Sequence, residues 1–158
     1  MSLMLKYITI FFVSMVPLIE LRGAVPIGTG MGLEWLPTLI ISIIGNCIPV
    51  PFILFFVKAI LKWMRTCSIK FFLKASNWLY EKAEKNRAKI EKYAIFGLYV
   101  FVAIPLPGTG AWTGALVASV FDMPKWKSVI SISAGVITAG IIMTVGSQLV
   151  KTVISLFY

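Results

Sequence analysis

Three long stretches without any charged residue most limit what this chain can fold into. They are Trp35–Val57, Tyr93–Phe121 and Ser128–Val150. Each is longer than the roughly 18 to 20 apolar residues that indicate a membrane-spanning helix. Charged residues make up 13% of the chain, whereas a soluble domain carries about 25%. The sequence therefore predicts an all-α integral membrane protein, with the lipid bilayer as its first partner.

The net charge of +9 is concentrated in the middle of the chain, where ten of the fifteen basic residues lie between Lys58 and Lys92. A basic cluster beside membrane segments follows the positive-inside rule and does not indicate nucleic-acid binding. We expect residues 58–92, Lys125 and Lys127 to be cytoplasmic. Glu34 and both termini are then expected on the external side.

The residue types that usually carry enzyme chemistry are scarce. The chain has no histidine, and Cys47 and Cys67 are too far apart for a CxxC motif. We expect two free thiols, no metal, no cofactor and no enzymatic activity. The N-terminal run Tyr7–Ile19 resembles a secretory signal but lacks a small-residue cleavage site, so we expect it to be retained.

The second half of the chain repeats the order of elements in the first. In each half an apolar run reaches Pro-Leu, a Gly/Pro-rich stretch follows, and an acidic residue precedes a long apolar block. A single shift places Pro17 on Pro105, Leu18 on Leu106 and Glu34 on Asp122. Other identity is thin, so the predicted repeat is one of element order.

The lengths of the apolar runs predict which segments of this repeat cross the membrane and which enter it only partway. At about 1.5 Å per residue, a run such as Tyr7–Ile19 or Tyr93–Ile104 covers about 20 Å, less than the hydrocarbon core of about 30 Å. Ala111–Phe121 is also short. We therefore expect each half to contain a re-entrant helical hairpin with a Gly/Pro tip near mid-membrane, followed by one transmembrane helix. The two transmembrane helices are expected in Trp35–Leu61 and Ser128–Leu156.

Hairpins that enter from opposite sides form an inverted repeat, which is typical of secondary transporters with a site at the midplane. We expect one membrane domain over residues 1–158, with repeat one in 1–62 and repeat two in 93–158. Residues 63–92 form a basic linker. Its apolar residues recur at helical spacing, which favours an amphipathic helix on the anionic inner leaflet over a solvated helix.

Glu20 and Arg22 are the strongest site candidates. An ionisable residue at membrane depth is costly and therefore indicates function. At a broken helical tip, with Gly23 and Pro26 shaping the first hairpin tip, the two charges can converge. Burial and a neighbouring guanidinium act oppositely on a carboxylate, which leaves Glu20 suited to proton exchange. Arg22 is expected either to pair with Glu20 or to bind an anionic substrate group. The alternative is a neutralising pair that only pins the hairpin.

The second tip contributes backbone groups rather than charge. Its glycines allow unusual dihedral angles, and the helix that begins near Ala111 exposes N–H groups that favour anions. Hydroxyl and aromatic side chains add further contacts; the alternative is that the glycines only let the two hairpins touch. The expected tip residues are Pro105, Pro107, Gly108, Thr109, Gly110, Trp112 and Thr113.

Two further features lie in the long apolar blocks. Asn46 precedes Pro49 and Pro51, so this stretch is either a packing kink or part of a cavity wall. Ser131, Gly135 and Ala139 recur every four residues in the last block. Such a stripe suits close helix contact, either between the two halves or in a homodimer.

The motifs ELRGAVP (Glu20–Pro26) and PLPGTGAWTG (Pro105–Gly114) resemble the family of putative small multidrug export proteins over nearly the whole chain. This family looks distantly related to DedA-type membrane proteins, which have two re-entrant hairpins in inverted repeat and are linked to translocation of lipid carriers. The resemblance implies that Glu20 and Arg22 are the functional charges, in a multi-pass protein of a prokaryotic inner membrane. The second hairpin departs from the DedA pattern because it carries no charged residue.

Taken together, the sequence predicts a small proton-coupled transporter of an amphipathic substrate, with a homodimer as the expected assembly. The first alternative is a DedA-like translocase of an anionic lipid such as a polyprenyl phosphate. The second is a structural membrane protein that transports nothing.

Overall fold

The computed structural model describes residues 2–66, 94–106 and 108–157. Within these ranges the chain is helical and contains no strand. The helices are α1 (Leu3–Met15), α2 (Glu20–Gly30), α3 (Trp35–Cys47), α4 (Pro49–Thr66), the unlabelled helix Ala94–Ala103, α6 (Ala111–Val120) and α7 (Lys125–Phe157).

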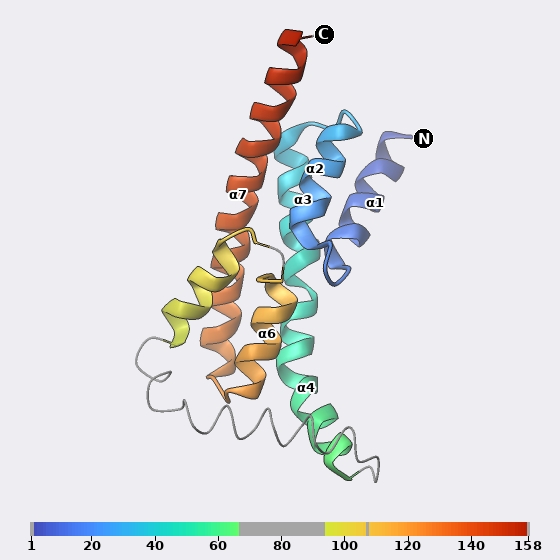
Figure 1. Ribbon diagram of the computed structural model, residues 1–158. Coiled ribbons are helices and arrows are strands. Elements are labelled where there is room, and N and C mark those ends of the chain that lie inside the picture. The colour runs from blue at the N-terminus through green and yellow to red at the C-terminus, as the bar shows by residue number, and fades with distance from the viewer. Residues whose placement is uncertain (1, 67–93, 107, 158) are drawn as a thin grey trace.

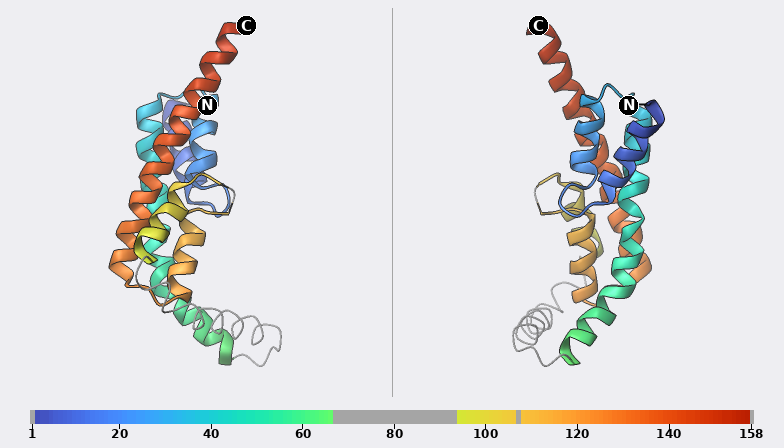
Figure 2. Two further views of the ribbon diagram at one scale, coloured as in Figure 1. Left: turned by 60° about the vertical axis from the view of Figure 1, so that its left-hand side comes forward. Right: turned by 90° about the vertical axis from the view of Figure 1, so that its right-hand side faces the viewer.

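Two short helical hairpins lie end to end along two long helical columns (Figures 1 and 2). α1 and α2 form the first hairpin, and Ala94–Ala103 and α6 form the second. α3 followed by α4 makes one column, and α7 makes the other. The turns of the two hairpins face each other near the middle of the molecule, and both chain termini lie toward the same end (Figure 1).

The first hairpin is shifted from its predicted position. Its first helix was expected over Tyr7–Ile19 but forms over Leu3–Met15, where the side chain of Ser2 caps the N-terminus by accepting from the Leu5 N–H. Pro17 lies in the turn between α1 and α2, and Leu18 takes a positive φ of 75° there. The chain therefore reverses at Val16–Ile19, before the glycine-rich stretch rather than within it.

The C-terminal ends of α2 and α6 have the same backbone structure. After α2, the Leu33 N–H donates to Gly28 O and Gly32 has a φ of 74°; after α6, the Met123 N–H donates to Ala118 O and Asp122 has a φ of 58°. Both ends are Schellman motifs, in which a left-handed residue closes the helix. In both, the next residue, Leu33 or Met123, is buried. Each motif leads directly into one of the long columns.

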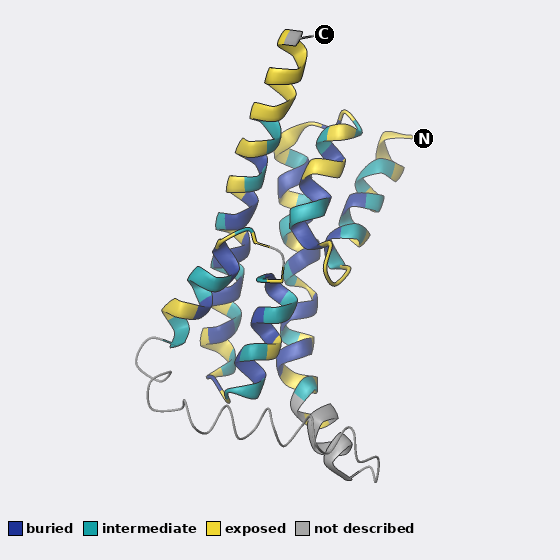
Figure 3. Cartoon of the chain, viewed as in Figure 1, coloured by how far each residue is buried: buried dark blue, intermediate teal, exposed yellow. Residues whose placement is uncertain are grey.

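The distribution of polar and apolar side chains suits a membrane. Small polar side chains on α1, α3, α6 and α7 are almost fully buried, among them Ser14, Thr38 and Ser42. Large apolar side chains such as Phe12, Phe52 and Ile130 point outward. Figure 3 shows the buried faces turned toward one another between the helices. Exposed apolar surface on this scale is stable where lipid, not water, surrounds the helices.

The small-residue stripe on α7 joins α7 to the second hairpin of the same chain. Ser131 Oγ donates to Ile95 O over 2.6 Å, and a Cβ at Gly135 would meet Val102 and the Tyr99 carbonyl. The absence of a side chain at Gly135 thus allows the backbones to approach closely. Ser131 and Gly135 therefore pack within the second half of the chain, a contact that is neither between the two halves nor between two copies.

Two of the described helical stretches are long and apolar enough to cross a membrane, Trp35–Val57 and Lys125–Leu156. They agree with the two predicted spans, and α3 gives way to α4 at Ile48, next to the predicted kink. Cys47 is a free cysteine. Cys67 and the predicted amphipathic helix lie outside the described residues.

Candidate functional site

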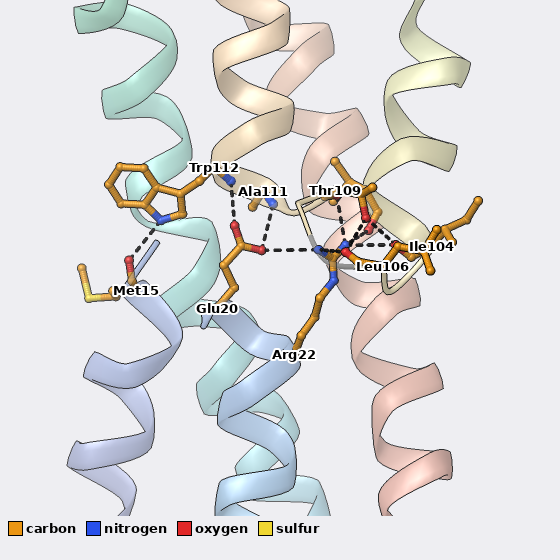
Figure 4. Close-up of polar contacts among 9 residues, drawn as sticks. Met15, Glu20, Arg22, Ile104, Leu106, Thr109, Ala111 and Trp112 are labelled. Atoms are coloured by element: carbon orange, nitrogen blue, oxygen red, sulfur yellow. Dashed lines mark hydrogen bonds and ion pairs between the residues drawn. The ribbon is translucent and has the colours of Figure 1, made fainter. Parts of the chain in front are cut away.

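The candidate site lies where the two hairpin turns meet (Figure 4). Glu20 begins α2 directly after the first turn and has a φ of 51°, a left-handed value that is uncommon for a residue with a side chain. Glu20 is only 5% exposed. Such a backbone costs free energy of order 1–3 kcal/mol and persists where the surrounding contacts hold it in place.

The carboxylate of Glu20 caps the N-terminus of α6. Its Oε2 accepts from the Ala111 N–H over 3.2 Å, and its Oε1 accepts from the Trp112 N–H over 3.0 Å. The first N–H groups of a helix have no partner inside the helix and carry the positive end of its dipole, so they bind an anion well. A Cβ at Gly110 would collide with this carboxylate. Glycine at position 110 therefore makes the contact possible.

The guanidinium of Arg22 binds the other backbone end of the second hairpin. Its Nη1 donates to Leu106 O over 3.0 Å. Its Nη2 lies 3.0 Å from Val102 O, 3.1 Å from Ile104 O and 3.0 Å from Thr109 O. Val102 lies in the last turn of the helix Ala94–Ala103, and the other three carbonyls follow its end. The C=O groups at the end of a helix lack intrahelical partners and favour a cation.

The side chains of Glu20 and Arg22 thus form their hydrogen bonds with the second hairpin and interact only weakly with each other. Arg22 Nη1 and Glu20 Oε2 are 4.0 Å apart, which is longer than a hydrogen-bonded ion pair. The negative side chain faces a helix N-terminus, and the positive one faces a helix C-terminus. This arrangement explains how the second hairpin can meet two charges without a charged residue of its own.

The second hairpin returns one contact to the first. Trp112 Nε1 donates to Met15 O, at the end of α1, over 3.0 Å (Figure 4). Thr109 acts within its own turn, where its hydroxyl donates to Ile104 O and Leu106 O. The Trp112 indole and the Thr109 hydroxyl are therefore engaged in holding the turns together.

Asn46 of α3 lies beside the two charges. It is 2% exposed, and its Oδ1 has no hydrogen-bond partner. It lines a small gap together with Glu20, Arg22, Gly110 and residues of α7 and the helix Ala94–Ala103, and this gap has no room for a water molecule. The site is closed and dry as observed.

The structure brings some of the predicted site residues together and separates others. Glu20, Arg22, Thr109, Gly110 and Trp112 come together as described above. Pro105 and Gly108 lie in the second turn, Gly108 with a φ of 82°, and Thr113 lies half-buried in α6. Pro107 lies outside the described residues.

Gly23 and Pro26 do not form the first tip. Both lie inside α2, which runs through the glycines to Gly30. Pro26 is the seventh residue of α2, so it removes the N–H that would donate to the Arg22 carbonyl, and glycine is tolerated where the helix packs closely. A Cβ at Gly23 would meet Ile19, and a Cβ at Gly28 would meet Thr38.

Sequence reasoning missed the backbone partners of the charges. It paired Glu20 with Arg22, whereas most of their partners are N–H and C=O groups more than eighty positions later. Nearly every residue has a backbone N–H and C=O, so the residue types do not reveal which of these groups will bind a charge. The absence of charge in the second hairpin was the one available signal, because buried charges need partners of some kind.

A wider apolar groove lies apart from this site, between α2 and α7. It has a volume of about 700 Å³, within the range of roughly 300–1,000 Å³ that takes small molecules. Lys151 is the charged residue among those that line it, beside Pro26, Thr29, Met143 and Ser147.

One comparison with known proteins gives a match. The model of a family described as "Putative small multi-drug export protein" matches residues 20–142. The matched region begins at Glu20, directly after the first turn, and includes Arg22 and the whole of the second turn. No curated protein and no solved structure matches the chain.

Proposed function

Because the chain belongs to the family of putative small multi-drug export proteins, we propose that it is a small secondary transporter with a proton-coupled site at Glu20. The substrate is a small amphipathic molecule, and the site lies near the centre of the membrane. The family and the long apolar helices make it a membrane protein. Neither gives the coupling ion or the substrate.

The observation that carries the proposal is the buried Glu20 carboxylate at the contact between two hairpins. A carboxylate at membrane depth costs several kcal/mol unless it is well paired. Here its pairing joins two separate parts of the chain, since the carboxylate is on α2 and its N–H partners are on α6. Adding a proton weakens this charge-assisted contact, which links protonation to the separation of the hairpins.

The lengths of the hairpin helices support a re-entrant arrangement. α2 has 11 residues and α6 has 10, so each covers about 15 Å, half of the hydrocarbon core. Non-helical turns at that depth require burial in protein. The matching Schellman motifs after α2 and α6 support two repeats of opposite orientation, residues 1–62 and 93–158.

The closed site supports an alternating mechanism. As observed, neither water nor substrate fits beside Glu20. A substrate can reach the centre only when one hairpin moves away from the other. Loss of the Glu20 cap would free the N-terminus of α6, and loss of the Arg22 contacts would free the carbonyls of the second turn.

The transport proposal has two versions, which differ in the charge of the substrate. In the first version the substrate is a drug, as in the family's name, and we take it to be a lipophilic cation. An anionic lipid phosphate is favoured by the Ala111 and Trp112 N–H groups, which would bind an anion after Glu20 leaves, and by Lys151 at the groove.

A third possibility is that the protein is structural and transports nothing. The four backbone carbonyls that bind Arg22 favour this possibility, because their hydrogen bonds give Arg22 a purely structural role in holding the two hairpins together. In that case Glu20 is also only a pin.

Reconstitution of the purified protein in liposomes tests the proposal. We expect a pH gradient to drive flux of tetraphenylphosphonium, a lipophilic cation, or of a short-chain polyprenyl phosphate. Glu20→Gln should abolish this flux, because the amide cannot exchange a proton. Glu34→Gln, near the end of α2, is the matched control and should retain it. Unchanged flux in a folded Glu20→Gln protein removes Glu20 from the mechanism.

We also expect a homodimer. The described helices enclose little space, and the end of α7 stands apart from the other helices with exposed apolar residues such as Leu149 and Val153 (Figure 3). Native mass spectrometry from detergent should give twice the mass of the 158-residue chain. A single-chain mass at every protein concentration contradicts this expectation.

A further inference from the structure

The unpaired Oδ1 of Asn46 has no role in the contacts described so far. A buried acceptor without a hydrogen bond costs about 1–3 kcal/mol in the folded state. Most buried polar atoms avoid this cost, so an orphaned one calls for an explanation. Asn46 lies on the same closed gap as Glu20, at the end of α3.

The chemistry of the carboxyl group explains why Asn46 Oδ1 lacks a partner. An ionised carboxylate accepts hydrogen bonds and donates none. Glu20 in that form is matched to the N–H groups of Ala111 and Trp112 but cannot serve another acceptor. A protonated carboxyl has one O–H donor, and that donor needs an acceptor.

We propose that Asn46 is the positioning residue for the protonated state of Glu20: its Oδ1 accepts the O–H that Glu20 gains when it takes up a proton. The step adds one proton from water to a carboxylate oxygen, forms one O–H bond and breaks no covalent bond. The ionised carboxylate is held by α6, and the neutral carboxyl is held by α3. This inference rests on the proposed function of Glu20 as the proton-coupling residue.

The surroundings of Glu20 favour a proton over a metal ion as the species taken up. The gap has no room for a water-sized particle. Arg22, 4.0 Å away, repels a cation. Among the residues lining the gap, Arg22 is the one other charged or titratable group. Leu21 of α2, Val102, Ala111 of α6, and Val136 and Ala139 of α7 supply apolar surface.

Infrared difference spectroscopy of the protein in liposomes tests the proposal without any transport assay. The C=O stretching band of a protonated carboxyl that grows as the pH falls, and that is absent in Glu20→Gln, reports protonation of Glu20. In Asn46→Leu, whose side chain branches at the same carbon and has no acceptor, we expect the midpoint of this band to move to lower pH by about one unit. One unit is the tenfold weaker proton binding that loss of one hydrogen bond produces. The band itself should move to the frequency of a more weakly bonded carboxyl.

Ser42→Ala is the matched control. Ser42 lies one helical turn before Asn46 on α3 and is also buried, with an unpartnered Oγ, but it does not line the gap. It should leave the midpoint and frequency unchanged. Asn46→Ala provides a second variant where Asn46→Leu lowers the folded yield.

The outcomes separate this inference from the function on which it rests. An unchanged Glu20 band in both Asn46 variants overturns the role of Asn46, even if the flux depends on Glu20. If the Asn46 variants shift the Glu20 band but the protein transports neither tetraphenylphosphonium nor the polyprenyl phosphate, the role of Asn46 is supported and the transport proposal is contradicted. Absence of any Glu20 band across the pH range overturns the inference.

Discussion

Glu20 combines three properties that rarely occur together: a left-handed backbone, a buried charge, and hydrogen bonds to a distant helix. Its positive φ follows a turn in which Leu18 is also left-handed. The two unusual conformations bring α2 sharply out of the turn and direct the carboxylate at α6. The strain is local, and the contacts that offset it come from the other half of the chain.

The absence of a side chain at Gly110 allows that carboxylate to approach α6 closely. We expect Gly110→Ala to displace Glu20 from the N–H groups of Ala111 and Trp112, because the new Cβ overlaps the carboxylate. The expected loss is about 1–3 kcal/mol of stability, typical of overpacking and a lost hydrogen bond. Thermal unfolding in detergent measures it.

Gly97→Ala is the control for this substitution. Gly97 lies within the helix Ala94–Ala103, and an added Cβ there meets nothing within 4 Å. The variant should be as stable as the wild type or slightly more stable, since alanine is the better helix former. Equal stability of both variants contradicts the close contact at Gly110.

The two hairpins interlock through helix ends. Glu20 caps the start of α6, Arg22 binds carbonyls at the end of Ala94–Ala103, and Trp112 binds the end of α1. Helix ends leave backbone groups unpaired, and in lipid each unpaired group is expensive. Placing the two turns against each other satisfies several of them at once.

The contact of α7 with Ala94–Ala103 depends on the absence of a side chain. We expect Gly135→Val to separate the two helices, because even a Cβ at this position lies 2.8 Å from the Val102 Cβ and 3.0 Å from the Tyr99 carbonyl oxygen. The predicted loss is about 1–3 kcal/mol, measured as a lower thermal unfolding midpoint in detergent.

Gly146→Val on the same helix is the matched control, since a Cβ at Gly146 meets nothing within 4 Å. It should leave the midpoint of the isolated chain nearly unchanged. A larger effect at Gly146 than at Gly135 means that the stripe packs elsewhere.

At the level of the whole molecule, both termini lie toward one end, and the hairpin turns meet near the middle (Figure 1). Glu34, at the start of α3, and Lys127, at the start of α7, follow hairpins of opposite direction. An inverted repeat in a membrane places these two residues on opposite sides, with the basic residue on the cytoplasmic side.

Cysteine labelling tests that topology. In a chain with Cys47 and Cys67 replaced by alanine, Glu34→Cys should react with an impermeant maleimide added outside cells. Lys127→Cys should react only after permeabilisation, which also serves as the control for accessibility. Reaction of both from the same side would rule out the inverted arrangement.

Much of the architecture follows from local sequence. The charge-free blocks predicted the long columns, and the short apolar runs gave Ala94–Ala103 and α6 nearly to the residue. Helix type and length depend on neighbouring residues and hydrophobicity, so they can be read from the chain. The first turn was placed too late because the glycines after Glu20 resemble a break, although α2 runs through them.

The sequence by itself determined that two charges would be buried at the first hairpin and that the second hairpin would offer only backbone. It could not determine how the charges are balanced. That required the tertiary structure, because Glu20 and Arg22 are bound by peptide N–H and C=O groups that every residue except proline possesses alike. Only their positions in space, at the ends of two helices brought against the first turn, make them the partners of a carboxylate and a guanidinium.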